Sequence, residues 1–92
     1  MIKSWKAAAT RRFAEQGTGR FSGLDHDKAM ARLQLLDAVQ SMEEIPPLAS
    51  IGLHKLKGAR KDQWAMTING PWRLVFEFRD GDAFEVEIVD DH

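Results

Sequence analysis

The stretch that decides the fold runs from Trp64 to Ile88 and reads WAMTINGPWRLVFEFRDGDAFEVEI. Apolar and polar side chains alternate along much of it, as they do in strands with one buried face. Asn69-Gly70 has the sequence of a tight hairpin turn, and so has Asp80-Gly81. The stretch therefore predicts three antiparallel strands in a meander.

The alternation also predicts which side chains of the meander point to the core. Successive strand residues point to opposite faces of a sheet. The expected core positions are Trp64, Met66, Ile68, Trp72, Leu74, Phe76, Phe78, Phe84, Val86 and Ile88. Arg73, Val75 and Glu77 are then expected on the opposite face of the central strand.

Two helices are predicted before the meander. Ala7 to Gln16 is rich in alanine and is followed by Gly17, a common helix stop. Ser22-Gly23-Leu24-Asp25 has the spacing of a capping box, so the second helix should begin near it. An apolar stripe at helical spacing carries that helix to about Ser41 or Met42.

The remaining segments are predicted as an edge strand and a loop. Ile2 to Lys6 is interpreted as an edge strand at the N-terminus. Prolines 46 and 47 end helical structure, and Pro46 to Asp62 is predicted as a loop. Four apolar side chains should anchor the loop to the core, namely Leu48, Ile51, Leu53 and Leu56. The predicted fold is α+β, with two N-terminal helices packed on a small antiparallel sheet, in one domain of residues 1–92.

Composition limits the classes of protein. The chain has 92 residues, of which 43% are hydrophobic and 29% charged, a typical globular balance. It has no cysteine, which excludes disulfides and thiolate metal sites. No signal peptide or membrane span is recognisable, so we expect a cytoplasmic protein that does not contact the membrane.

Charge is distributed unevenly along the chain. The net charge is −1, but Arg79 is the only basic side chain among residues 74–92, which hold seven of the 14 acids. The first 73 residues are correspondingly basic. One part of the molecule is therefore suited to phosphates and another to basic partners.

Several segments together resemble one family. They are Met1-Ile2-Lys3-Ser4, Arg32-Leu33, Leu36-Asp37-Ala38, Leu53-His54-Lys55-Leu56-Lys57-Gly58, Trp64, Trp72-Arg73-Leu74 and Asp90-Asp91-His92. In this order and at this total length they resemble the HigB branch of the RelE/ParE toxin superfamily, over essentially the whole chain. The resemblance implies a RelE-like fold and a type II toxin-antitoxin system. It also implies a ribosome-dependent mRNA endoribonuclease that needs neither a metal nor another cofactor.

The resemblance implies a mechanism in which a 2′-hydroxyl attacks the adjacent phosphate. Such a reaction needs a base, an acid and cations for the charge of the transition state. His54 and His92 are the expected acid–base pair, in either order, and Asp90 would orient a histidine. Arg73 would grip the phosphate through its guanidinium, with Lys57 as a second cation.

Other residues are given smaller roles. Lys55, Arg60 and Lys61 extend the basic loop and are expected to contact RNA backbone. The family commonly ends in Asp-Tyr-His, whereas this chain has Asp91 in place of the tyrosine. That acid is not expected to be catalytic and should weaken RNA binding. The histidines lack the spacing of metal ligands, so no metal site is predicted.

The resemblance also implies partners, and it leaves two alternatives. The expected partners are the ribosome with its mRNA and a HigA-like helix-turn-helix antitoxin, through which operator DNA would be reached indirectly. The free toxin should be a monomer and the complex a heterotetramer. One alternative is a ParE-like toxin that targets DNA gyrase, which has no need of a histidine pair. The other is an interaction module of the same fold that has lost cleavage.

Overall fold

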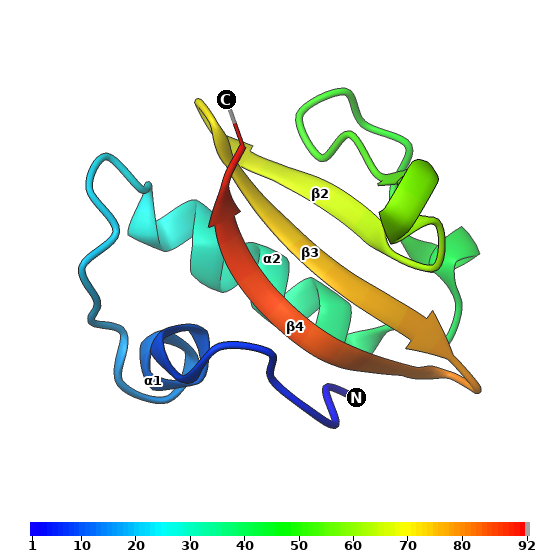
Figure 1. Ribbon diagram of the computed structural model, residues 1–92, viewed down its shortest axis with the longest axis horizontal. Helices are drawn as coiled ribbons and strands as arrows, with labels where there is room; N and C mark the ends of the chain where they lie inside the picture. Colours follow the sequence, from blue (N-terminus) through cyan, green and yellow to red (C-terminus); the bar gives the residue numbers. More distant parts are fainter. Residues whose placement is uncertain (92) are drawn as a thin grey trace.

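The computed structural model describes residues 1–91. In that range the order is α1 (Ala8–Gln16), α2 (His26–Ala38), β1 (His54–Lys55), β2 (Trp64–Asn69), β3 (Trp72–Arg79) and β4 (Asp82–Asp90), with short 3₁₀ helices at Met42–Glu44 and Gly58–Arg60. The strands form one antiparallel sheet in the order β1-β2-β3-β4. Helix α2 lies across one face of the sheet and α1 packs beside β4 (Figure 1). The predicted α+β class, with two helices on an antiparallel sheet, is confirmed.

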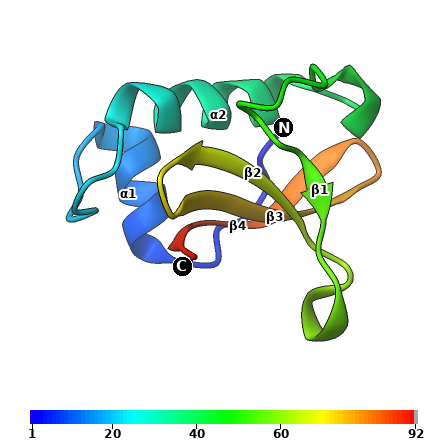
Figure 2. The same cartoon turned by 90° about the horizontal axis from the view of Figure 1, so that it is seen from above.

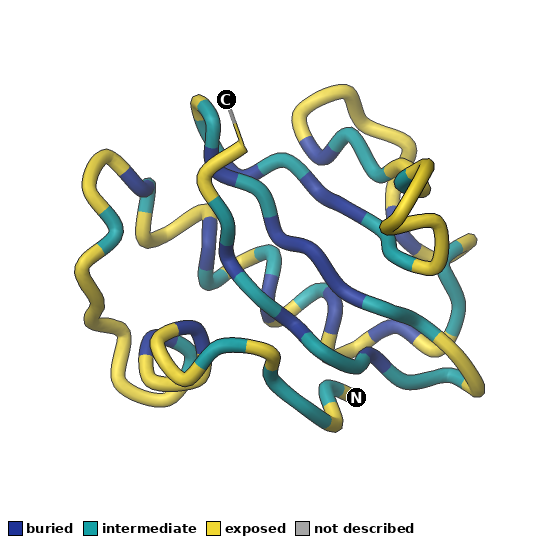
Figure 3. Tube along the Cα trace, in the orientation of Figure 1, coloured by how far each residue is buried: buried dark blue, intermediate teal, exposed yellow. Residues whose placement is uncertain are grey.

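The core lies between the helices and the sheet. Phe13 from α1, Leu36 from α2, and Met66, Leu74 and Phe76 from the sheet are fully buried. The centre of β3 is accordingly the most continuous buried segment in Figure 3. Seen from above, α2 covers one face of the sheet, while the segment around Gly58–Arg60 projects on the other side (Figure 2). Within residues 1–91, the second face is therefore covered by no α-helix.

The helices begin and end for local reasons. Gly17, at φ 72°, ends α1 and donates its N–H to the Phe13 carbonyl oxygen, as predicted. The cap of α2 is Asp25, whose side chain accepts from the Lys28 N–H at 3.0 Å, so the expected role of Ser22 was wrong. Helix α2 also ends earlier than predicted, because Ser41 caps a separate 3₁₀ helix.

The predicted N-terminal edge segment is present, but it does not form a continuous strand. It runs parallel to β4 through backbone hydrogen bonds and two isolated bridges, Ile2 to Ala83 and Trp5 to Val86. Glu85 interrupts the edge of β4 between them, since its φ is 52°. Its backbone N–H bonds to the Ser4 hydroxyl instead of a ladder carbonyl. This irregularity prevents a continuous strand.

The sheet has one strand that was not predicted, β1, which lies inside the segment predicted to be a loop. His54 pairs with Ala65 and Lys55 with Trp64 at the edge of β2. Hydrogen bonds from Thr67 N to Ile51 O and from Leu56 N to Gln63 O extend the contact in both directions. This segment covers the otherwise unpaired edge of β2. Of its expected anchors, Ile51 is buried, but Leu48 is 57% exposed, so that anchor was wrong.

The meander follows the prediction except at its first turn and at one core position. The first turn is Gly70-Pro71 instead of the expected Asn69-Gly70, because Asn69 still pairs with Trp72. Asp80 and Gly81, both at positive φ, form the second turn as predicted. Phe84 was expected in the core, but Ala83 is buried there, and Phe84 instead packs under the Arg79 guanidinium at 3.9 Å. The irregularity at Glu85 shifts the alternation by one residue. None of the helices within residues 1–91 is long and apolar enough to cross a membrane.

Candidate active site on the open face of the sheet

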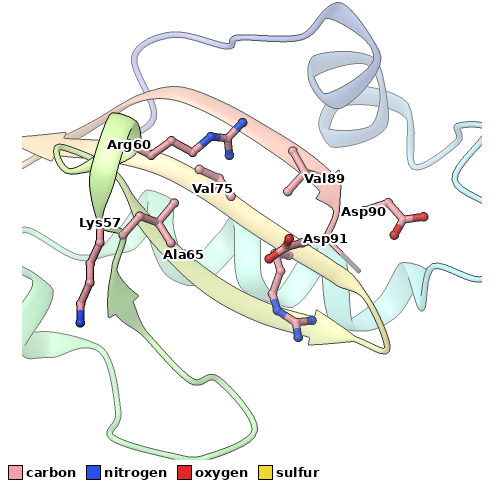
Figure 4. A pocket seen from close by; sticks show the side chains of 9 residues that line it. Lys57, Arg60, Ala65, Val75, Val89, Asp90 and Asp91 are labelled. Carbon is pink, nitrogen blue, oxygen red and sulfur yellow. The ribbon is translucent and has the colours of Figure 1, made fainter.

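A cleft of about 320 Å³ opens on the face of the sheet that the helices leave uncovered. It is lined by Leu56, Lys57, Arg60, Ala65, Arg73, Val75, Val89, Asp90 and Asp91. Figure 4 shows several of these side chains, which come from the loop before β2, from the sheet and from the end of the chain. The floor is apolar and the walls are charged. Such a hollow is suited to a ligand with both apolar and anionic parts.

Strand register places Arg73 in this cleft. Arg73 pairs with Thr67 on β2 and with Val89 on β4, and the neighbouring row pairs Ala65 with Val75. Paired residues share a face, and Leu74 on the other face is fully buried under the helices. The prediction that Arg73 faces away from the core is confirmed.

The hairpin turn holds the Arg73 guanidinium. Nη1 donates to the carbonyl oxygens of Gly70, at 2.6 Å, and of Trp72, at 3.0 Å. The turn is itself fixed to the segment before α2, because the Asn69 amide accepts from Asp25 N and donates to Gly23 O. These contacts orient the arginine in advance. Nε and Nη2 make no hydrogen bond within residues 1–91, so they are available to a phosphate.

The basic loop contributes two of its four cations to the cleft. Lys57 and Arg60 line it, and in Figure 4 the Arg60 side chain crosses above Val75 while the Lys57 amine extends away from the other labelled groups. Lys55 lies 5.7 Å from the centroid of the Trp64 ring, and Lys61 is exposed beyond the 3₁₀ helix; neither lines the cleft. Lys57 and Arg60 are therefore the loop cations best placed for a ligand.

The two carboxylates at the end of the chain face different ways. Asp90 lines the cleft and pairs with Trp72, a core residue, but its carboxylate points away from the other labelled side chains in Figure 4. Asp91, held by a bond from its N–H to Pro71 O, turns its carboxylate toward the cleft. The sequence interpretation favoured Asp90 and set Asp91 aside. The alternation of β4 could have found this, because it puts Asp90 on the face of Ile88.

His54 lies on β1, on the same face as the cleft but outside it. It pairs with Ala65, which pairs with Val75, so the three residues form one row across the sheet. The ring is exposed, and Nδ1 lies 2.9 Å from the Gly52 carbonyl oxygen. A carbonyl only accepts, so Nδ1 carries the proton and Nε2 of the neutral ring has a free lone pair. His92, the other expected member of the acid–base pair, lies outside the described residues.

Sequence reasoning missed Glu87, which it did not single out from the seven acids of residues 74–92. Its side chain is only 13% exposed, and it lies 3.8 Å from both Lys6 and Arg60. Alternation with Val86 and Ile88 did predict that Glu87 lies on the open face, but it did not predict that the side chain is largely buried.

Among residues 1–91 no group of three or more His, Cys, Asp or Glu side chains is arranged to hold a metal ion.

One known family has a model that matches almost the whole of this chain. The model of a family described as RelE-like toxin of type II toxin-antitoxin system HigB matches residues 3–92. The chain belongs to this HigB-like toxin family. A type II toxin has an antitoxin as its partner, so the toxin is one half of a pair.

Relatives of this HigB-like toxin support the assignment. It is 34% identical to Endoribonuclease HigB of Proteus vulgaris over 93 residues, which cover all of both chains. Two solved structures of YafQ from E. coli share its fold. A mutant of YafQ gives a TM-score of 0.63 at 15% identity, and YafQ from strain BL21(DE3) gives 0.62 at 14%. In both cases 98% of this chain and 93% of the other are covered.

Proposed function

We propose that this toxin is an endoribonuclease that cleaves mRNA on the ribosome without a metal ion. The observation that carries the proposal is the cleft on the open face, where Arg73 is pre-oriented by the hairpin turn and Lys57 and Arg60 add positive charge. The relative named Endoribonuclease HigB supports the same activity. The cleft is open enough to admit a single strand with its bases unstacked.

The reaction is an internal transesterification. The 2′-oxygen attacks the adjacent phosphorus, its proton passes to a base, and the bond from phosphorus to the 5′-oxygen breaks as an acid protonates that oxygen. The products carry a 2′,3′-cyclic phosphate and a 5′-hydroxyl. Arg73 binds the non-bridging oxygens and stabilises the charge that develops on them, with Lys57 as a second cation.

His54 and His92 are the proposed acid–base pair. The free lone pair on Nε2 of His54 suits the base, and the exposed ring is accessible to a ribose. His54 on β1 and Arg73 on β3 lie two strands apart, about 10 Å across the sheet, and two residues apart along the strands. In this proposal the RNA lies across Ala65 and bridges that gap. Asp90 retains the proposed role of orienting a histidine.

The proposed partners follow from the same function. The antitoxin is a HigA-like helix-turn-helix protein, which would connect the toxin to operator DNA. The resting complex is a heterotetramer, and the free toxin acts as a monomer in the cytoplasm. Lys55 and Lys61, which lie outside the cleft, contact ribosomal or messenger RNA backbone.

The decisive experiment compares the wild type with His92→Gln in growing cells. The 5′ ends of cellular mRNA are mapped after expression of each protein. Cuts in phase with codons, present in the wild type and absent from His92→Gln, are expected. His26→Gln is the matched control, because it makes the same change at an exposed histidine at the start of α2 and should leave cleavage intact.

Growth arrest with intact mRNA in the wild type would overturn the proposal. It would favour DNA gyrase or another target, as in the ParE-like alternative. Absence of both growth arrest and cleavage would favour an interaction module that has lost its chemistry. A downstream reading frame for a helix-turn-helix protein of about 100 residues is expected from the HigB resemblance.

A further inference from the structure

Glu87 is an acid that is largely, but not fully, buried on the open face of the sheet. It pairs with Val75 in the register of β3 and β4, so it lies in the same row of the sheet as Ala65 and Val75, which line the cleft. Its side chain is 13% exposed, and Oε1 is buried with no hydrogen-bond partner within residues 1–91. Burial of a carboxylate is unfavourable unless cations compensate it. Its presence on a face suited to phosphates needs a reason.

Two cations reach Glu87 from distant parts of the molecule. Lys6 follows the N-terminal segment that runs beside β4, and its Nζ lies 3.8 Å from Oε1. Arg60 comes from the 3₁₀ helix before β2, and its Nη2 lies at the same distance from the same oxygen. Both distances are within ion-pair range but beyond hydrogen-bond range. Glu87 is therefore the point where two cations from different segments meet.

Arg60 must extend across the sheet to reach this carboxylate. In Figure 4 its side chain runs above Val75, with the guanidinium at the rim of the cleft. An arginine on a surface loop ordinarily samples many rotamers, and holding it in one costs conformational entropy. An anchoring carboxylate offsets that cost in advance. The Arg60 side chain remains 48% exposed, so a ligand still has access to it.

We propose that Glu87 is a positioning residue that holds the Arg60 guanidinium over the sheet, where it binds a backbone phosphate of single-stranded RNA. The inference rests on the proposed function, since it assigns RNA to this face. Lys6 keeps the Glu87 carboxylate compensated when Arg60 turns to the phosphate. Glu87 thus acts through Arg60 and does not touch the ligand.

This role and a simple charge effect predict opposite results. A carboxylate on an RNA-binding face repels phosphates, so its removal should tighten binding if it does nothing else. If it positions Arg60, its removal should weaken binding although the face becomes more positive. Glu77 provides the matched control. It lies on the same face of β3, is paired with Arg79 at 2.7 Å and does not line the cleft.

The test measures binding of a fluorescein-labelled 2′-O-methyl RNA oligonucleotide, which lacks the attacking hydroxyl, by fluorescence anisotropy. Glu87→Gln is expected to weaken binding by about fivefold, the upper end of what an exposed charge contact contributes. Glu77→Gln should leave binding unchanged or tighten it. Thermal unfolding of each variant verifies that it is folded. If Glu87→Gln folds poorly, Glu87→Asp keeps the charge and should show a smaller weakening.

A double-mutant cycle separates positioning from a structural role. In an Arg60→Ala background, Glu87→Gln should cause no further loss of binding, because the group through which it acts is gone. Additive losses, equal or tighter binding by Glu87→Gln, or no binding of the oligonucleotide by the wild type would each overturn the inference. Cleavage is measured separately. A wild type that binds as expected but does not cut mRNA would refute the proposed function and leave this inference standing.

Discussion

The two faces of β3 differ in what covers them. Leu74 and Phe76 point to the helices and are fully buried, whereas Arg73 and Glu77 point to the open face and keep contact with solvent. Val75 is an exception, since it is 2% exposed although no helix covers it. Side chains of the basic loop cover it instead. The helix-covered face therefore provides most of the stability. The open face provides the candidate site, and the loop before β2 covers the floor of that site.

The largest expected effect is a loss of stability from a substitution on the helix-covered face. Phe76→Ala should lower the free energy of unfolding by about 3–5 kcal/mol, because it leaves a cavity in the core. Val75→Ala, the next residue on the other face, should cost only about 1–2 kcal/mol. Urea unfolding measures both. Equal losses would mean that the open face is a second core rather than a site.

Arg73→Ala should affect cleavage of mRNA strongly and the stability of the protein only slightly. Loss of a pre-oriented guanidinium should lower cleavage of mRNA by about 10²- to 10³-fold. The free energy of unfolding should change by less than about 1 kcal/mol, as for most partly exposed positions. Arg79→Ala, at the far end of the same strand, is the control and should cleave normally. An unfolded Arg73→Ala protein would make the arginine structural and remove it from the site.

A third prediction concerns Thr10→Val, at the contact between α1 and β4, the strand that leads to the candidate site. The buried Thr10 hydroxyl accepts from the Ile88 N–H at 3.0 Å, and valine leaves that donor unpaired. The expected cost is about 1–3 kcal/mol in the free energy of unfolding. Faster hydrogen exchange of the Ile88 amide should accompany it. Thr18→Val, in the exposed loop after α1, should have no such effect on stability or exchange.

The smallest expected effect is an increase in the rate of mRNA cleavage. Asp91→Tyr removes a carboxylate from the cleft and adds a ring that can stack on a base, so cleavage should rise by about tenfold or less. Asp91→Asn separates the two causes, because it removes only the charge. Initial rates of mRNA cleavage measure both variants. Unchanged or slower cleavage by Asp91→Tyr would show that the native carboxylate does not limit the rate of cleavage.

Local patterns predicted most of the sheet and part of the site. The strands at residues 64–88 and the Asp80-Gly81 turn were predicted correctly because alternation and turn preferences act within a few residues. The orientation of Arg73 followed from the same alternation. The strand at His54 was missed, since two residues carry no periodic pattern and pair only because β2 offers a free edge. The roles of His54, His92 and Asp90 remain predictions.

Local sequence patterns were enough to predict two helices, the meander and the side of β3 that carries the arginine, because these features depend on neighbours along the chain. Only the tertiary structure decided that Ala83 replaces Phe84 in the core, that Asp91 faces the cleft, and that Lys6 and Arg60 meet at Glu87. The physical reason lies in contact range. A strand's period is set by local sterics, whereas the strained backbone of Glu85 and the ion pairs of Glu87 exist only where segments distant in sequence come together.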